Sequence, residues 1–316
     1  MANEKTCKNQ IDIFNFLRFT ALFCVLGSHA RIVISSHLPN FDMQNSFSVF
    51  WFTPAWFAME LFFLISGYLL GKGFYSGKYT TDFRGIKNFC FQRLIRILPV
   101  YLFFLLINFL FICPDYLVIN KWKAIIPLLT FTYHGVPLSE TISPCWFIST
   151  IMQLYLAAPL IYKYVISKIK TKHLLYIFII AVLWCAFRLM GNYVFHWAWA
   201  TKIYAPSWFN VDLFFCGMLY NSITNVEISE NIKKYVRPIS LILLFALIAV
   251  CAIEYYKEIY TFQRYFAPTL CIFVFGLIVY SFDSKNRSYS EKITFGNFIK
   301  NPLRILDIIG ILSFEM

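Results

Sequence analysis

Two ionisable side chains, Arg18 and His29, lie inside the apolar stretch 13–34 near the start of the chain. On a helix their spacing amounts to three turns plus about 20°, so both project from one face, about 16.5 Å apart along the axis. Ionisable residues are costly in a membrane span and usually face a polar cavity. The pattern indicates a polar track with an imidazole suited to acid–base chemistry. The alternative is that Arg18 snorkels to the inner interface while His29 sits at the outer one.

The next apolar stretch, FAMELFFLISGYLL, contains a carboxylate, Glu60, at its outer end. A carboxylate in a span is better explained as a functional group, or as a partner for His29 or an arginine, than as a packing residue. Ser66 and Gly67 follow in the same stretch, and small residues of this kind favour the close approach of another helix. We therefore interpret Glu60 as functional and the Ser66–Gly67 pair as a packing feature.

Arg93 and Arg96 share one helix face at the end of a cation-rich segment, 72–96. This segment has six lysines and arginines, Lys72 and Lys87 among them, and a single acidic residue. For any one arginine, the simpler interpretation is a charge that anchors the cytoplasmic side of the membrane. Taken together, the cations suit the phosphates of a polyanionic cofactor such as coenzyme A.

A fourth segment, CWFISTIMQLYLAAPLIYKY, begins with the interfacial aromatic residue Trp146 and adds polar atoms at Ser149 and Tyr155. Amphipathic aromatic residues are common in membrane helices, so this segment alone is a weak signal. We expect Trp146, Ser149 and Tyr155 to contribute to substrate binding if the preceding features act with them.

The composition defines the scaffold that must position these residues. Hydrophobic residues make up 59% of the chain and charged residues 14%, whereas soluble domains have roughly 45–50% and roughly 25%. One soluble core could not hide so much apolar surface. The sequence therefore predicts an all-α integral membrane protein, a single domain over 1–316 with about nine to ten transmembrane helices, the last one incomplete.

The apolar runs long enough to span a bilayer are 13–34, 55–71, 97–113, 146–166, 174–190, 207–223, 238–255 and 266–282, with a last one from about Leu303. Whether the short run 124–132, interrupted by Pro127, also crosses is left open.

The charges set the orientation and exclude one class of partner. If 124–132 does not cross, most of the 28 lysines and arginines fall on the same side of the membrane as the N-terminus. Because lysines and arginines accumulate in cytoplasmic loops, this predicts a cytoplasmic N-terminus. Arg188 is among the charges assigned to the outer side. The net charge of +12 comes from short loops between apolar runs, so we expect no nucleic-acid partner. The nine cysteines form no CxxC pair and no zinc-spaced cluster, and we expect no metal site.

In series, these four features resemble the acyltransferase-3 family of membrane O-acyltransferases. The family's first-span signature, an Arg, ten residues and a His, is matched by Arg18 and His29, and its [DE]-LFF-x-[LI]-S-G-[FY] stretch by ELFFLISGY. Its RRxxRxxPxY-like stretch is matched by Arg93, Arg96, Pro99 and Tyr101. Its W-x-L/I-S…Y-L…P stretch is matched by Trp146, Ser149, Tyr155 and Pro159. The chain departs from the family in having Asn15 for the Asp of a D-G-L-R tetrapeptide, and Ile151 and Met152 where many members have a pair of glutamates.

The resemblance implies a transferase of the O-antigen, peptidoglycan or exopolysaccharide acetylase type in the bacterial cytoplasmic membrane. It would move an acetyl or other acyl group from cytoplasmic acyl-CoA (acetyl-CoA) to a carbohydrate hydroxyl, with no permanently bound cofactor. His29 would act as base, Arg18 would stabilise charge, and Glu60 would orient His29 or bind acceptor hydroxyls. The resemblance further implies a donor set of residues that bind the acyl-CoA, namely Arg93, Arg96, Lys72 and Lys87. It also implies an acceptor set that binds the carbohydrate, namely Trp146, Tyr155 and Ser149.

Two other function classes fit parts of the pattern. A transporter or flippase of lipid-linked or acylated sugars would also use a polar intramembrane track and basic inner loops, and a structural membrane partner is the third class. The family's last span carries S-[YF]-x-x-Y-L-x-H, whereas the chain ends at Ser313-Phe314-Glu315-Met316. From this resemblance we expect the chain to be C-terminally truncated.

Overall fold

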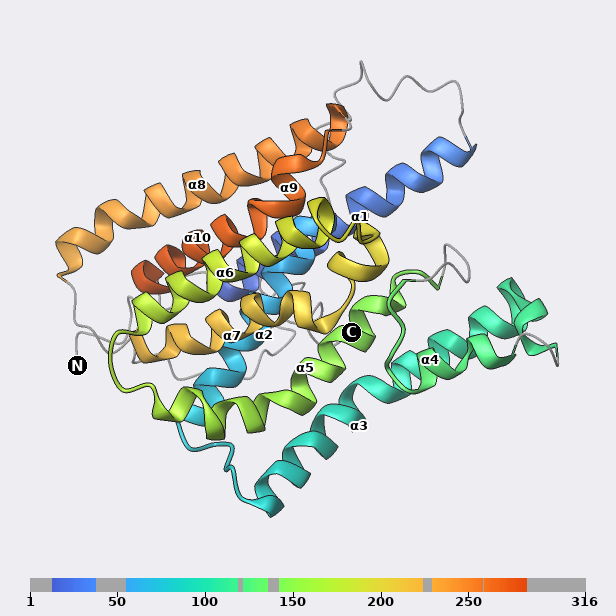
Figure 1. Ribbon diagram of the computed structural model, residues 1–316, viewed down its shortest axis with the longest axis horizontal. Coiled ribbons are helices and arrows are strands. Elements are labelled where there is room, and N and C mark those ends of the chain that lie inside the picture. The colour runs from blue at the N-terminus through green and yellow to red at the C-terminus, as the bar shows by residue number, and fades with distance from the viewer. Residues whose placement is uncertain are drawn as a thin grey trace, which may run out of the picture. The chain divides into compact units, whose positions relative to one another are not determined.

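A computed structural model describes residues 13–37, 55–118, 122–135, 142–223, 229–257 and 259–282 (Figure 1). All regular structure in these ranges is helical, which confirms the all-α class. The α-helices are α1 (Ile13–His37), α2 (Ala55–Tyr75), α3 (Phe83–Ile107), α4 (Ile126–Leu129), α5 (Cys145–Tyr164), α6 (His173–Tyr193), α7 (Ser207–Ile223), α8 (Glu230–Lys257), α9 (Thr261–Tyr265) and α10 (Ala267–Phe282).

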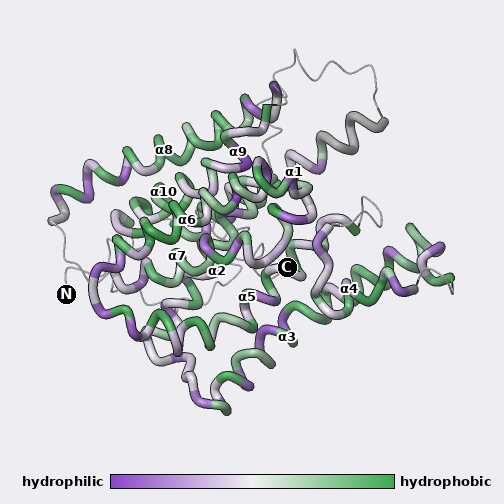
Figure 2. Tube along the Cα trace, viewed as in Figure 1, coloured by the Kyte–Doolittle hydropathy of each residue, from purple (hydrophilic) through white to green (hydrophobic). Residues whose placement is uncertain are grey.

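Six of the described helices are long and apolar enough to cross a membrane, and their apolar character is visible in Figure 2. Helix α10, with 16 residues, is apolar but shorter, and α7 has 17 residues. The predicted number of nine to ten spans is not confirmed, and the span expected from Leu303 lies outside the described residues. The six segments are Ile13–Ala30, Ala55–Tyr75, Phe83–Ile112, Cys145–Lys168, His173–Tyr193 and Asn231–Glu254.

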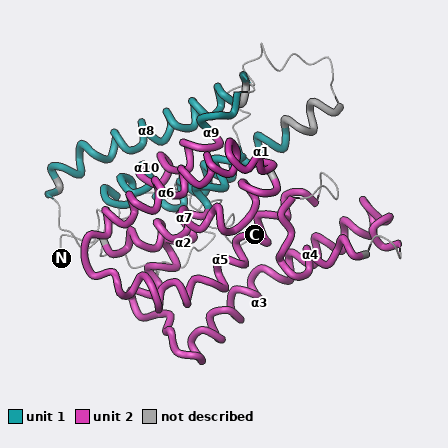
Figure 3. Tube along the Cα trace, viewed as in Figure 1, with its two compact units in different colours: residues 1–62, 227–263, 274–316 teal, residues 63–226, 264–273 magenta. Residues whose placement is uncertain are grey.

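The chain groups into two compact units, drawn in separate colours in Figure 3. Unit 1 comprises 1–62, 227–263 and 274–316, and unit 2 comprises 63–226 and 264–273. Unit 1 contains α1 and α8, and unit 2 contains α3 to α7. The expectation of a single domain over 1–316 stays a prediction.

Contacts between α3 and α5 settle the path of the short run 124–132. Arg93 near the start of α3 lies against Tyr155 in the second half of α5, whereas Phe109, just beyond α3, packs in one cluster with Cys145 at the start of α5. The two helices are therefore antiparallel, so the chain between them leaves and returns at the same end. The run 124–132 does not cross.

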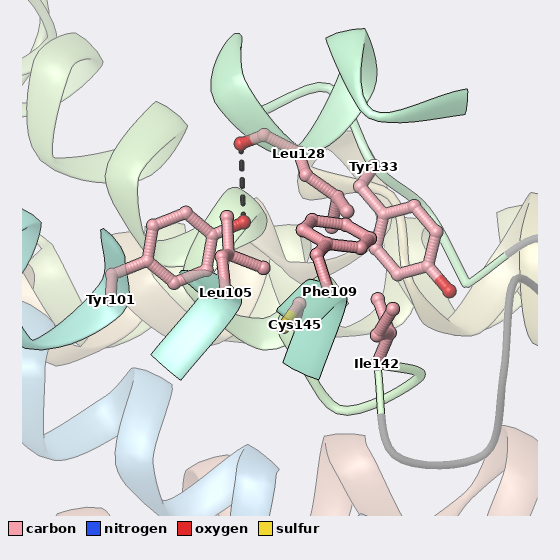
Figure 4. Packing of buried hydrophobic residues seen from close by; sticks show 7 residues of the cluster. All are labelled: Tyr101, Leu105, Phe109, Leu128, Tyr133, Ile142 and Cys145. Carbon is pink, nitrogen blue, oxygen red and sulfur yellow. Dashed lines mark hydrogen bonds between the residues drawn. The ribbon is translucent and has the colours of Figure 1, made fainter. Parts of the chain in front are cut away.

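A buried cluster fills the space between this connection and the two helices (Figure 4). The hydroxyl of Tyr101 donates a hydrogen bond to the carbonyl of Leu128 over 3.1 Å, which ties the four-residue helix α4 to α3. Pro127, the second residue of α4, lacks an N–H that a helix start would leave unsatisfied anyway. The cluster consists of Tyr101, Leu105, Phe109, Leu128, Tyr133, Ile142 and Cys145.

Glycines bring α2 and α7 into backbone contact within unit 2. A Cβ built on Gly67 would lie 2.0 Å from the carbonyl oxygen of Phe214, and one on Gly217 would lie 2.3 Å from that of Leu64. In the same contact the side chain of Asn221 donates to the Tyr68 carbonyl over 2.6 Å. These contacts confirm the interpretation of Gly67 as a packing residue, because only a residue without a Cβ lets the two backbones approach so closely.

Candidate functional site

The predicted site residues divide between the two units. Arg18, His29 and Glu60 belong to unit 1. The predicted donor and acceptor residues all belong to unit 2. Each group is described within its own unit.

In α1, Arg18 is buried and His29 is exposed. Nη1 of Arg18 donates a hydrogen bond to Oδ1 of Asn15 over 3.0 Å, one turn earlier on the same helix. Asn15 therefore supplies the oxygen that orients the guanidinium, at the position where an Asp was expected. The shared face of α1 is buried around Arg18 and open at His29, so the role of His29 as a base stays a prediction.

Glu60 of α2 is buried and belongs to unit 1. Glu60, Cys24 of α1 and Glu254 of α8 all lie within electrostatic range of Cys251. The carboxylate of Glu254 accepts the backbone N–H groups of Phe262 and Gln263 over 2.9 and 2.7 Å, and so caps the short helix α9. Glu60 and Glu254, which the sequence analysis did not identify, thus both lie within electrostatic range of the same thiol.

At the end of unit 2 that carries the cations, Arg93 is held by aromatic rings. Its Nη2 donates to the hydroxyl of Tyr79 over 2.7 Å. The guanidinium carbon lies 5.6 Å from the ring centroid of Tyr79, 5.3 Å from that of Phe89 and 5.4 Å from that of Tyr155. Cation–π contacts of this kind fix the plane of the guanidinium while its other N–H groups remain available as donors. Tyr155, predicted to bind acceptor, contacts Arg93 of the predicted donor set.

The other predicted donor residues lie on α2 and α3, in the same cation-rich segment as Arg93. Lys72 is half-buried in the last turn of α2, while Lys87 and Arg96 are exposed on α3. The one acidic residue of the segment, Asp82, is the N-cap of α3 and accepts hydrogen bonds from Thr80 and from the backbone of Gly85. The bond from Thr80 lowers the pKa of the Asp82 carboxyl. Asp82 is thus ionised and caps α3, while the lysines and arginines of the same segment are of a type suited to phosphate groups.

At the opposite end of α5, Trp146 is half-buried and its ring lies 4.5 Å from that of Tyr204. Ser149 is fully buried beside Tyr101. Of the three residues predicted to bind acceptor, Trp146 is therefore the one with an accessible side chain, and the structure does not bring Tyr155 to it.

His134, which the sequence analysis did not identify, lies in unit 2 after α4 and packs its ring 5.4 Å from that of Trp208. Burial, with Lys202 nearby, lowers the pKa of the imidazole. A neutral imidazole is the form that acts as a general base. His134 is thus a second histidine whose contribution must be compared with that of His29.

An ion pair within unit 2 was also missed. Nη2 of Arg188 lies 2.7 Å from Oδ1 of Asp212, and the side chains are 4% and 0% exposed. Arg188, which the sequence analysis counts among the charges of the outer side, lies within α6 rather than in a loop, and its side chain turns toward α7. The available signal was an acid and a base within two consecutive apolar runs, although nothing in their spacing pairs them.

No group of three His, Cys, Asp or Glu side chains that could hold a metal ion occurs in the described ranges. None of the eight cysteines in these ranges forms a disulfide.

The sequence model of the acyltransferase-3 family, described as an acyltransferase domain, matches residues 11–314. No curated protein matches the chain significantly. No solved structure matches it either.

Proposed function

The chain belongs to the acyltransferase-3 family and is a membrane acyltransferase, and from this premise we propose that it moves an acetyl group from cytoplasmic acetyl-CoA to a hydroxyl of a cell-envelope carbohydrate. The observation that supports a CoA donor is the Arg93 guanidinium, which Tyr79, Phe89 and Tyr155 hold in place at the end of unit 2 where the lysines and arginines of the segment 72–96 lie. The proposed location is the bacterial cytoplasmic membrane, with a cytoplasmic N-terminus. Helix α7, about 25 Å long, would cross it beside α2.

The proposed roles follow the two units. In unit 1, His29 removes the proton of the acceptor hydroxyl, Arg18 stabilises negative charge that develops, and Glu60 orients His29 or binds the acceptor. In unit 2, Arg93, Arg96, Lys72 and Lys87 bind the phosphates of the donor. Trp146 contributes an aromatic face to acceptor binding, and Tyr155 positions Arg93.

The test is the mass of the cell-envelope glycans from strains with and without the intact gene. We expect glycans that carry an added acetyl group in the strain with the gene and unmodified glycans without it. A transporter of acylated sugars, the main alternative, would change where such glycans accumulate without cleaving a thioester. Purified protein in nanodiscs that releases free CoA from acetyl-CoA only when the glycan fraction is added supports transfer, and protein that never cleaves the thioester contradicts it.

Loss of either arginine of the donor set should weaken donor binding. A lost charge-assisted hydrogen bond to a phosphate costs about 1.5–3 kcal/mol, or roughly 10- to 150-fold in affinity. Arg96→Ala should lower acetyl-CoA affinity by this amount with little loss of stability, because Arg96 is exposed. Arg93→Ala should lower both the acetyl-CoA affinity and the stability, because it also removes the contacts to Tyr79, Phe89 and Tyr155.

Acetyl-CoA binding in nanodiscs and thermal unfolding measure these two effects separately. Tyr79→Phe is the matched control, since it removes only the hydroxyl that accepts from Arg93 and keeps the ring. Unchanged donor affinity in both arginine variants would reduce the two residues to charges that set membrane orientation.

A further inference from the structure

The buried ion pair between α6 and α7 has a geometry that a role in stability alone does not explain. Nη2 of Arg188 contacts both Oδ1 of Asp212, at 2.7 Å, and the carbonyl of Phe209, at 2.6 Å. Among the described residues, Nη1 of Arg188 and Oδ2 of Asp212 have no hydrogen-bond partner. Taking two charges out of water is costly, and apolar residues of similar volume often stabilise a fold as well or better. Such a pair in a membrane bundle therefore points to a function.

The ion pair is part of a set of side-chain hydrogen bonds that converge on the start of α7. Thr150 of α5 donates to the carbonyl of Ala205, and Trp184 of α6 donates to that of Trp208 over 2.8 Å. Asn210 bonds back to the carbonyl of Tyr204 over 2.7 Å. Because these donors come from α5, α6 and α7 itself, the stretch 204–209 is held from several sides.

Tyr204, at the start of this stretch, belongs to a row of aromatic rings, which we call the aromatic row. It begins with Trp146 of α5, whose ring centroid is 4.5 Å from that of Tyr204, and continues to Trp199, stacked 6.1 Å from Tyr204. The guanidinium of Arg264 lies 5.4 Å from the Trp199 ring. Trp146, Tyr204 and Trp199 are half-buried rather than enclosed in the core. Flat rings with an adjacent cation suit a ligand that has both apolar faces and polar groups.

We propose that Arg188 and Asp212 are positioning residues that hold the start of α7, and through it Tyr204 against Trp146, in the geometry that binds the carbohydrate acceptor. The inference rests on the proposed function. The pair acts by orienting groups. Arg188 fixes the first turn of α7 by donating a hydrogen bond to the Phe209 carbonyl, and Asp212 keeps the guanidinium pointed at that carbonyl. An apolar replacement could fill the same volume but would supply no donor to Phe209. A small displacement of a binding group can lower the rate about a hundredfold.

The test compares three changes at matched protein abundance: Asp212→Asn, Arg188→Met, and Arg188→Met combined with Asp212→Leu. Each is measured for thermal unfolding in nanodiscs, for acetyl-CoA binding and for acetylation of the envelope glycans. Arg188→Met leaves a buried carboxylate without its partner and should lower the unfolding temperature most. The double variant should unfold near the wild-type temperature and bind acetyl-CoA normally, yet acetylate glycans about tenfold to a hundredfold less. Lys170→Met, which removes an exposed cation of unit 2, is the control for loss of charge.

The outcomes separate a positioning role from a structural one. A double variant that recovers both the unfolding temperature and full glycan acetylation overturns the inference, because the pair then serves only stability. If the double variant does not insert, Asp212→Asn decides: it keeps the shape of the side chain, and full acetylation at wild-type stability overturns the inference. Reduced acetylation with normal acetyl-CoA binding supports it in either variant. A wild-type protein that acetylates no glycan instead rejects the proposed function.

Discussion

His29→Ala is expected to abolish acyl transfer while insertion and abundance stay close to those of the wild-type protein. A sugar hydroxyl has a high pKa and needs a base in the transition state, and loss of a general base costs about 10²–10⁴-fold in rate. His29 is exposed on α1, so its removal leaves no cavity in the core and should cost little stability. The measurement is CoA release from acetyl-CoA in the presence of the glycan fraction, with unfolding temperature as the check on folding.

His134→Phe is the comparison variant, since it removes the other candidate imidazole but keeps a ring against Trp208. Full activity in this variant, together with its loss in His29→Ala, assigns the base to His29. If His29→Ala retains a tenth or more of the wild-type rate, His29 is not the base, because the loss would then be smaller than general-base catalysis supplies. Loss of activity in His134→Phe but not in His29→Ala would assign the general base to His134 of unit 2.

The helices could be predicted from the sequence wherever an apolar run coincides with a whole helix. The run 207–223 matches α7 at both ends, and 146–166 matches α5 to within two residues. Helix α3 is different, because it begins at Phe83 whereas the predicted span begins at 97. Its first turns contain the cations of the inner segment, and the signal for its start is the N-cap Asp82 rather than hydropathy.

The candidate site was predictable only in its residue types. A motif identifies Arg93 and Tyr155 as candidates, but their contact depends on the register between α3 and α5, which the sequence of either helix does not contain. The same holds for Arg188 and Asp212, whose pairing follows from how α6 packs along α7. Arg18 and Asn15 are the opposite case, because residues three apart on one helix are neighbours whatever the fold around them.

Gly67→Ala is expected to cause the largest loss of stability among single changes to the interface between α2 and α7. The added Cβ would lie 2.0 Å from the carbonyl oxygen and 2.8 Å from the carbonyl carbon of Phe214. These are backbone atoms that cannot rotate away, so α7 as a whole must move from α2. Overpacking of this kind costs about 1–3 kcal/mol and occasionally more. Tyr204 lies just before α7 and Phe209 lies in its first turn. Displacement of α7 should therefore lower glycan acetylation together with the unfolding temperature.

Two other glycines supply a graded series for this prediction. Gly217→Ala places its Cβ 2.3 Å from the carbonyl oxygen of Leu64 in the same interface, whereas Gly191→Ala meets only side chains, the nearest being Trp197 at 3.0 Å. The unfolding temperature in nanodiscs should fall most for Gly67→Ala, almost as much for Gly217→Ala and least for Gly191→Ala. Combining the first two changes should cost less than their sum, since a helix displaced by one clash has already moved from the other. A Gly67→Ala protein that unfolds at the wild-type temperature would show that α2 and α7 are not in backbone contact.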